Sequence, residues 1–96
     1  MDLQKLLKEN REEILRIATK HGASNVRIFG SVARNQASET SDIDFLIHLE
    51  DGRSLLDLIR FDDDLQALLK CKIDVISDGA LDPQKDENIF AEAIAL

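Results

Sequence analysis

The chain has 96 residues, of which 44% are hydrophobic and 32% charged, and nineteen acidic residues against twelve basic ones give a net charge of −7. This length leaves room for one domain, residues 1–96, and the composition predicts a folded chain with a soluble surface. The acidic balance disfavours sequence-blind binding to nucleic acid or to anionic membranes, which requires a basic surface. Four Phe without Trp or Tyr also disfavour an aromatic platform for stacked bases.

The cysteine count and the apolar runs indicate the compartment. Cys71 is the only cysteine, so no internal disulfide can form and nothing requires an oxidising compartment. No apolar run approaches the roughly eighteen residues of a membrane span, and the N-terminus has no basic segment followed by a long apolar run. We therefore expect a cytoplasmic protein that does not enter the membrane.

Hydrophobic periodicity predicts three helices and three strands. The first half of the chain indicates a helix at about 2–20, a strand at Asn25–Phe29, a polar turn-rich stretch at Arg34–Ser41 and a strand over Ile43, Phe45 and Ile47. The second half indicates a helix over Leu55–Leu69, a strand at Lys72–Ser77 and a last helix that begins at Asp82–Pro83. The apolar face of this last helix consists of Ile89, Phe90, Ala93 and Ile94. The order αββαβα predicts an α/β (α+β) fold, with a small mixed three-stranded sheet flanked by helices.

Helix ends are marked by residues that favour caps. Gly22, which follows His21, is typical of a helix stop, because glycine enters the left-handed conformation at low cost. Ser54 with Asp57 three residues later resembles a capping box. Asp82–Pro83 places a capping residue before a proline at the first helical position.

Three aspartates on two predicted strands are the candidate catalytic residues. Asp42 and Asp44 lie two residues apart, so both point to one face, about 6.6 Å apart along the backbone. Carboxylates this close repel each other, and a divalent cation removes the conflict because oxygen ligands suit Mg²⁺. Asp74 reaches the same site if its strand is a neighbour. Such a site suits phosphoryl or nucleotidyl transfer.

The segment around Gly30 is a candidate phosphate site. Gly30 lets the backbone approach phosphate closely, and Ser31 and backbone N–H groups at a helix start donate to phosphate oxygens. Ser31 as a simple helix cap is compatible with that role, since both use the same geometry. For Arg34, a charge-assisted phosphate contact and a surface ion pair stay equally open.

The combined spacing resembles a known family. In this chain Gly30-Ser31 is followed by ten residues and then by Asp42-x-Asp44. This pattern resembles that of the DNA polymerase beta-like nucleotidyltransferases. The resemblance is greatest to the minimal nucleotidyltransferases, the MntA-type antitoxins encoded beside HEPN-domain toxins. The resemblance covers nearly the whole chain, through Gly30-Ser31-Val32-Ala33-Arg34, Ser41-Asp42-Ile43-Asp44, Ser54-Leu55-Leu56-Asp57-Leu58 and Lys72-Ile73-Asp74-Val75-Ile76.

This resemblance implies an activity and a role for each matching residue. Gly30 and Ser31 would hold the triphosphate, Asp42 and Asp44 would bind one or two Mg²⁺ ions, and Asp74 would be a third metal ligand or would take the acceptor proton. The implied reaction moves AMP from ATP onto a tyrosine of the HEPN ribonuclease toxin, with which the chain would form a hetero-oligomer.

Two positions depart from the family pattern, and the chain lacks its own acceptor. Asn35 stands where the family usually has Gly, and Val32 where a larger or polar residue is frequent. A chain without Tyr cannot modify itself on tyrosine, so the acceptor must come from another protein.

The sequence also allows two other functions, and it contains other polar residues that could belong to a site. A binding module that masks the toxin without catalysis, and nucleotidyl transfer to a small molecule, are the alternatives. His48 lies about 13 Å along its strand from Asp44, too far to share a metal, and is expected to be an exposed strand end. Asp62–Asp64 are expected on a solvated helix face, His21 at a helix end, and Cys71 as a thiol without chemistry.

Overall fold

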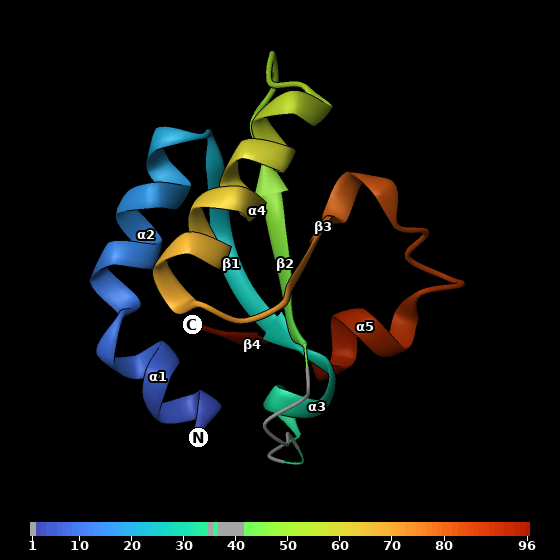
Figure 1. Ribbon diagram of the computed structural model, residues 1–96. Helices are drawn as coiled ribbons and strands as arrows, with labels where there is room; N and C mark the ends of the chain where they lie inside the picture. The colour runs from blue at the N-terminus through green and yellow to red at the C-terminus, as the bar shows by residue number, and fades with distance from the viewer. Residues whose placement is uncertain (1, 35, 37–41) are drawn as a thin grey trace.

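The computed structural model describes residues 2–34, 36 and 42–96 (Figure 1). Its elements are α1 (Leu3–Glu9), α2 (Arg11–Lys20), β1 (Ala23–Phe29), α3 (Gly30–Ala33), β2 (Ile43–Leu49), α4 (Leu55–Leu69), β3 (Ile73–Ser77), the 3₁₀ helix η1 (Asp78–Ala80), α5 (Glu87–Glu92) and β4 (Ile94–Ala95). The helices α1, α2 and α4 cover one face of the sheet, whereas η1 and α5 lie away from that layer, beyond β3 and beside α3 (Figure 1). In the described part of the chain, no helix has the length and apolar character needed to cross a bilayer.

The sheet has the strand order β3-β2-β1-β4. Strand β1 is antiparallel to both β2 and β4, while β2 and β3 run parallel. The predicted mixed α/β fold is therefore confirmed, and the strand count is four rather than three. The additional strand is Ile94–Ala95, which pairs with Arg27 and Ile28. The sequence placed Ile94 on the last helix, but Ala93 has an extended backbone and the chain binds the free edge of β1 instead.

Two of the predicted helices are shorter than expected. The first is split at Asn10, whose side-chain amide donates to the Leu6 carbonyl oxygen at 2.8 Å. The apolar spacing persists across this break, which is why periodicity alone predicted one helix. The last helix begins at Glu87 rather than at Asp82, because Asp82 accepts from the backbone N–H of Gln84 at 2.9 Å and so forms a turn.

The strand β2 places its main core residues and Asp44 on opposite faces of the sheet. Ile43, Phe45 and Ile47 are fully buried against the helix layer. Asp44 alternates with them and therefore points to the opposite face of the sheet. On that face Leu46 is fully buried as well. The core thus fixes the register of β2, and the register fixes the direction of Asp44.

Side-chain contacts hold the helix α4 at two places, a capping box at its start and an aspartate–histidine contact further along. The predicted capping box is present, with the Ser54 backbone N–H donating to Asp57 at 2.9 Å. His21 ends α2 as expected, but it is buried and its Nε2 lies 2.6 Å from a carboxylate oxygen of Asp64. Asp64 is therefore not simply solvated, because α2 packs beside α4 and brings the histidine to it.

Candidate active site

The two parallel strands bring two of the candidate aspartates side by side. Asp44 of β2 and Asp74 of β3 are register partners, so their side chains leave the sheet on the same face. The pairing of β2 with β3 begins at Ile43, the residue after Asp42, whose backbone N–H donates to the Lys72 carbonyl oxygen at 3.0 Å. Asp42 therefore directly precedes the paired region. The condition for Asp74 to reach this site, that its strand is a neighbour, is met.

The electrostatics of this group centre on Asp44. The pKa of Asp44 is raised from 3.8 to about 6, first by burial and then by the nearby charges of Asp74, Asp42 and Glu92 in that order, while Arg34 acts to lower it. A half-buried carboxylate among three other acids retains its proton unusually well. The site thus holds more negative charge than its single arginine balances, which is the condition that a bound cation would relieve.

Gly30 joins β1 to α3 directly against Asp44. Its φ of +74° lies in the region that favours glycine, and an added Cβ would sit 2.1 Å from an Asp44 carboxylate oxygen. The pairing of Phe29 with Asp44 across β1 and β2 produces this approach. The sequence indicated glycine here for phosphate access, and the structure adds that a side chain would displace the carboxylate.

Ser31 and Arg34 flank the turn that Gly30 begins. Ser31 is half-buried as the second residue of α3, and Arg34 is the residue that ends this four-residue helix. The Arg34 guanidinium forms an ion pair with Glu92 of α5 and donates to Gln36 at 3.2 Å. Of the two possibilities for Arg34, the ion pair is thus present in the structure, and Asn35 lies outside the described residues.

Glu92 is the residue near the site that the sequence did not single out. It lies 58 positions from Arg34 in the chain. No local pattern joins an acid on the last helix to an arginine after the first strand, so only the tertiary fold reveals the pair.

The two remaining polar candidates are His48, which lies apart from the three aspartates, and Cys71, whose thiol is not activated. The His48 Nδ1 atom lies 3.1 Å from Asp78, which also accepts from Arg27 at 3.2 Å. This cluster occupies the far end of β2, as expected for His48. Burial and then the Asp42 charge raise the pKa of the Cys71 thiol, which keeps it protonated and unreactive.

The three aspartates fit a hard divalent cation by their chemistry. Asp42, Asp44 and Asp74 offer only carboxylate oxygens, and their charges oppose one another. Within residues 2–34, 36 and 42–96, however, no group of three or more acidic, histidine or cysteine side chains is placed so that it could hold a metal ion. A cation bound by all three aspartates would therefore require their side chains to move.

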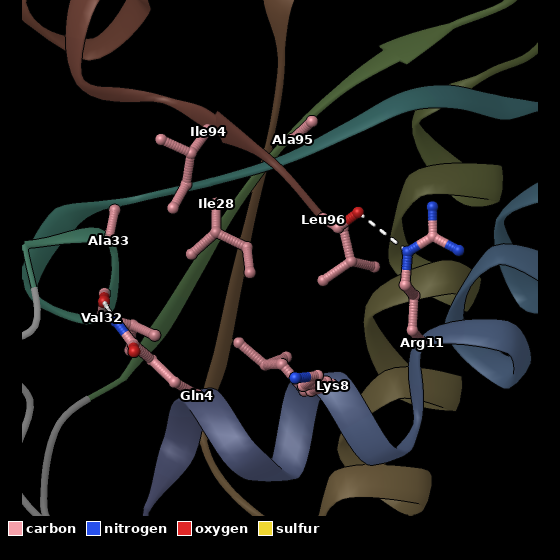
Figure 2. A pocket seen from close by; sticks show the side chains of 10 residues that line it. Gln4, Lys8, Arg11, Ile28, Val32, Ala33, Ile94, Ala95 and Leu96 are labelled. Carbon is pink, nitrogen blue, oxygen red and sulfur yellow. Dashed lines mark hydrogen bonds between the residues drawn. The ribbon is translucent and has the colours of Figure 1, made fainter.

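One pocket of the described structure lies away from the three aspartates (Figure 2). Its volume is about 240 Å³, and it is lined by Gln4, Leu7, Lys8, Arg11, Ile28, Val32, Ala33, Ile94, Ala95 and Leu96. Figure 2 shows Arg11 on one side, donating to the Leu96 carbonyl oxygen at 3.0 Å. Because Ile28 belongs to the helix-covered side of the sheet, this pocket is not the space in front of Asp44.

Comparison with known proteins identifies the family. The nucleotidyltransferase domain family matches residues 3–96, so the chain belongs to this family and is a nucleotidyltransferase. A Methanocaldococcus jannaschii protein, provisionally named a protein adenylyltransferase, is 40% identical over 88 residues, which are 92% of this chain and 95% of that protein. The protein adenylyltransferase MntA of Thermococcus cleftensis is 32% identical over 91 residues, covering 86% of this chain and 92% of that protein.

Solved structures agree with this assignment. One described, again provisionally, as a minimal nucleotidyltransferase has a TM-score of 0.88 and 45% identity, over 100% of this chain and 97% of that one. A crystal structure of a toxin–antitoxin with AMP-PNP has a TM-score of 0.76 over 90% of this chain and 71% of that one. Its identity is 15%, so this second likeness concerns the fold alone.

Proposed function

We propose that this nucleotidyltransferase is the antitoxin of a toxin–antitoxin pair and that it transfers AMP from ATP to a tyrosine of a HEPN ribonuclease toxin. The observation that carries the proposal is the register pairing of Asp44 with Asp74 directly against Gly30. This arrangement puts a group of acids beside a turn whose positive φ favours glycine. The names of the relatives, protein adenylyltransferases, support AMP as the group transferred.

The three aspartates would hold magnesium. Asp42 and Asp44 are the proposed ligands of one or two Mg²⁺ ions, and Asp74 is either a further ligand or the group that accepts the tyrosine proton. When bound, Mg²⁺ neutralises charge on the triphosphate and lowers the pKa of the attacking hydroxyl. The raised pKa of Asp44 supports this assignment, because it marks a carboxylate that needs a positive partner.

The phosphate side of the site would be formed by the turn after β1. Gly30 leaves room for a phosphate oxygen to approach the backbone, and Ser31 would donate its hydroxyl. Arg34 would supply a cationic contact to the phosphates. These three residues lie within five positions of one another, so a single short turn would present the nucleotide to the aspartates.

The proposed step conserves atoms and charge. The tyrosine oxygen forms a bond to the α-phosphorus of ATP, the bond from that phosphorus to the bridging oxygen of the β-phosphate breaks, and pyrophosphate leaves. The tyrosine proton passes to Asp74 or to water. The acceptor comes from a second protein, since the sequence contains no Tyr.

The test is transfer of label from ATP to the toxin. Incubating the protein with α-labelled ATP, Mg²⁺ and the HEPN toxin is expected to label the toxin, and replacing its acceptor tyrosine by Phe is expected to remove the label. Asp42→Asn is expected to abolish labelling, whereas Asp63→Asn, a change at an exposed position of α4, leaves it unchanged. If the toxin stays unlabelled but is inhibited equally by the wild type and by Asp42→Asn, the protein masks the toxin without catalysis. If label appears on a small molecule alone, the acceptor is that molecule and not the toxin.

A further inference from the structure

Glu92 closes the candidate site from the side of the last helix. It is the final residue of α5, and it forms an ion pair with Arg34 at the end of α3. The Glu92 side chain is 23% exposed and the Arg34 side chain 51% exposed. The acid is therefore the better anchored partner, and the arginine is held toward it. The packing of α5 beside α3 brings the two residues together (Figure 1).

The charge of Glu92 also acts on Asp44. It acts in the same direction as the charges of Asp74 and Asp42, although more weakly. Four acids and one arginine are therefore involved here, and the arginine is engaged by the acid of α5. This fourth acid is not needed to complete the three-carboxylate set.

A guanidinium binds carboxylate and phosphate oxygens through the same donors. Both anions accept charge-assisted hydrogen bonds in the plane of the arginine. We infer that Glu92 competes with the nucleotide phosphates for Arg34, so that it occupies the arginine in the nucleotide-free protein and is displaced when the nucleotide binds. The inference rests on the proposed function in one respect, the contact between Arg34 and phosphate.

Competition for Arg34 can be distinguished experimentally from simple repulsion between Glu92 and the nucleotide. Any acid near the site weakens binding of an anionic nucleotide by repulsion, and that effect persists whether or not Arg34 is present. Competition for Arg34 instead disappears when Arg34 is removed. A double-mutant cycle on these two residues separates the two effects, because they lie in direct contact.

The experiment measures the dissociation constant of AMP-PNP in the presence of Mg²⁺ by calorimetry. We expect Glu92→Gln to bind about twofold to fivefold more tightly than the wild type, the change that corresponds to losing one partly exposed competing ion pair. Arg34→Gln is expected to bind about tenfold more weakly. Adding Glu92→Gln to Arg34→Gln is expected to give a smaller gain than in the wild type, because only the repulsion by Glu92 is then removed. Glu87→Gln, at an exposed position of the same helix, is the matched control and leaves binding unchanged.

Three results would overturn the inference. Weaker or unchanged binding by a folded Glu92→Gln protein would make Glu92 a ligand or a purely structural residue. A gain of equal size without Arg34 would reduce its effect to repulsion, and a wild type that binds no AMP-PNP would remove the ligand for which Glu92 competes. If the cycle behaves as expected but no AMP reaches the toxin, the proposed function fails and the competition stands.

Discussion

The molecule contains two groups of three aspartates, one on helix α4 and one at strands β2 and β3, and the surroundings of the two groups differ. Asp62–Asp64 are consecutive on α4, so their side chains leave the helix in different directions. There Asp62 accepts from Gln66 at 2.8 Å and Asp64 lies 2.6 Å from His21. The group on the sheet is spread over more than thirty positions of the sequence, yet β2 and β3 set Asp44 and Asp74 in register.

Backbone geometry, rather than the density of acids in the sequence, thus decides whether aspartates are brought against one another. On the helix, two of the three acids have their own hydrogen-bond partner. On the sheet, Asp44 is surrounded mainly by other acids, and burial with their charges raises its pKa. Asp62 and Asp64 thus have partners in the fold, whereas the separated acids mainly face one another's charge.

The largest expected effect is on catalysis. Asp44→Asn is expected to lower the rate of AMP transfer to the toxin at least a hundredfold, because it removes the negative charge at the centre of the proposed metal site. Asp63→Asn, within the helical group, is the control and is expected to retain the wild-type rate. Transfer by Asp44→Asn above a tenth of the wild-type rate would contradict the distinction between the two groups.

The next effect concerns the space in front of Asp44. Gly30→Ala is expected to destabilise the fold by about 2 kcal/mol or more in urea unfolding, because it adds a clash with Asp44 to the cost of a positive φ. Gly52→Ala is the matched control, since Gly52 has a φ of +87° and nothing within 4 Å of an added Cβ. Its expected cost is only about 1 kcal/mol, and equal losses at both positions would show that the carboxylate yields freely.

A third prediction uses the titration of Asp44 in protein kept free of metal by EDTA. Its folded pKa of about 6 is above the ordinary value of 3.8, so the folded state binds this proton more tightly than the unfolded state does. The resulting stability is complete below about pH 4 and is lost as the pH rises through 6. We therefore expect the melting temperature of Asp44→Asn to exceed that of the wild type at pH 8, and the difference to shrink toward pH 4. A difference independent of pH would contradict the shift.

The smallest expected effect lies in the helical group. Asp64→Ala removes the partner of buried His21 and is expected to cost about 1 kcal/mol in urea unfolding. Its rate of AMP transfer is expected to stay at the wild-type level. A loss of transfer in a folded Asp64→Ala protein would link the two acidic groups and remove the contrast between them.

Much of this architecture could be predicted from local patterns. The alternation of Ile43, Phe45 and Ile47 gave β2 and the direction of Asp44, and the spacing from Gly30 to Asp44 indicated the candidate site. The strand at residues 94–95 could not be predicted, because it depends on a free edge of β1 far away in the sequence. The same reason hides the pair of Arg34 with Glu92, whose partners carry no shared local signal.

The register of Asp44 with Asp74 also makes the candidate site depend on two distant parts of the chain. Strands β1 and β2 are joined by a short connection, whereas β3 pairs with β2 across the whole of α4. This pairing places Asp74 beside Asp44, and the repulsion between them is part of what the folded state must tolerate. A cation that binds all three aspartates would therefore favour the folded chain over the unfolded one, in which the three are not held together.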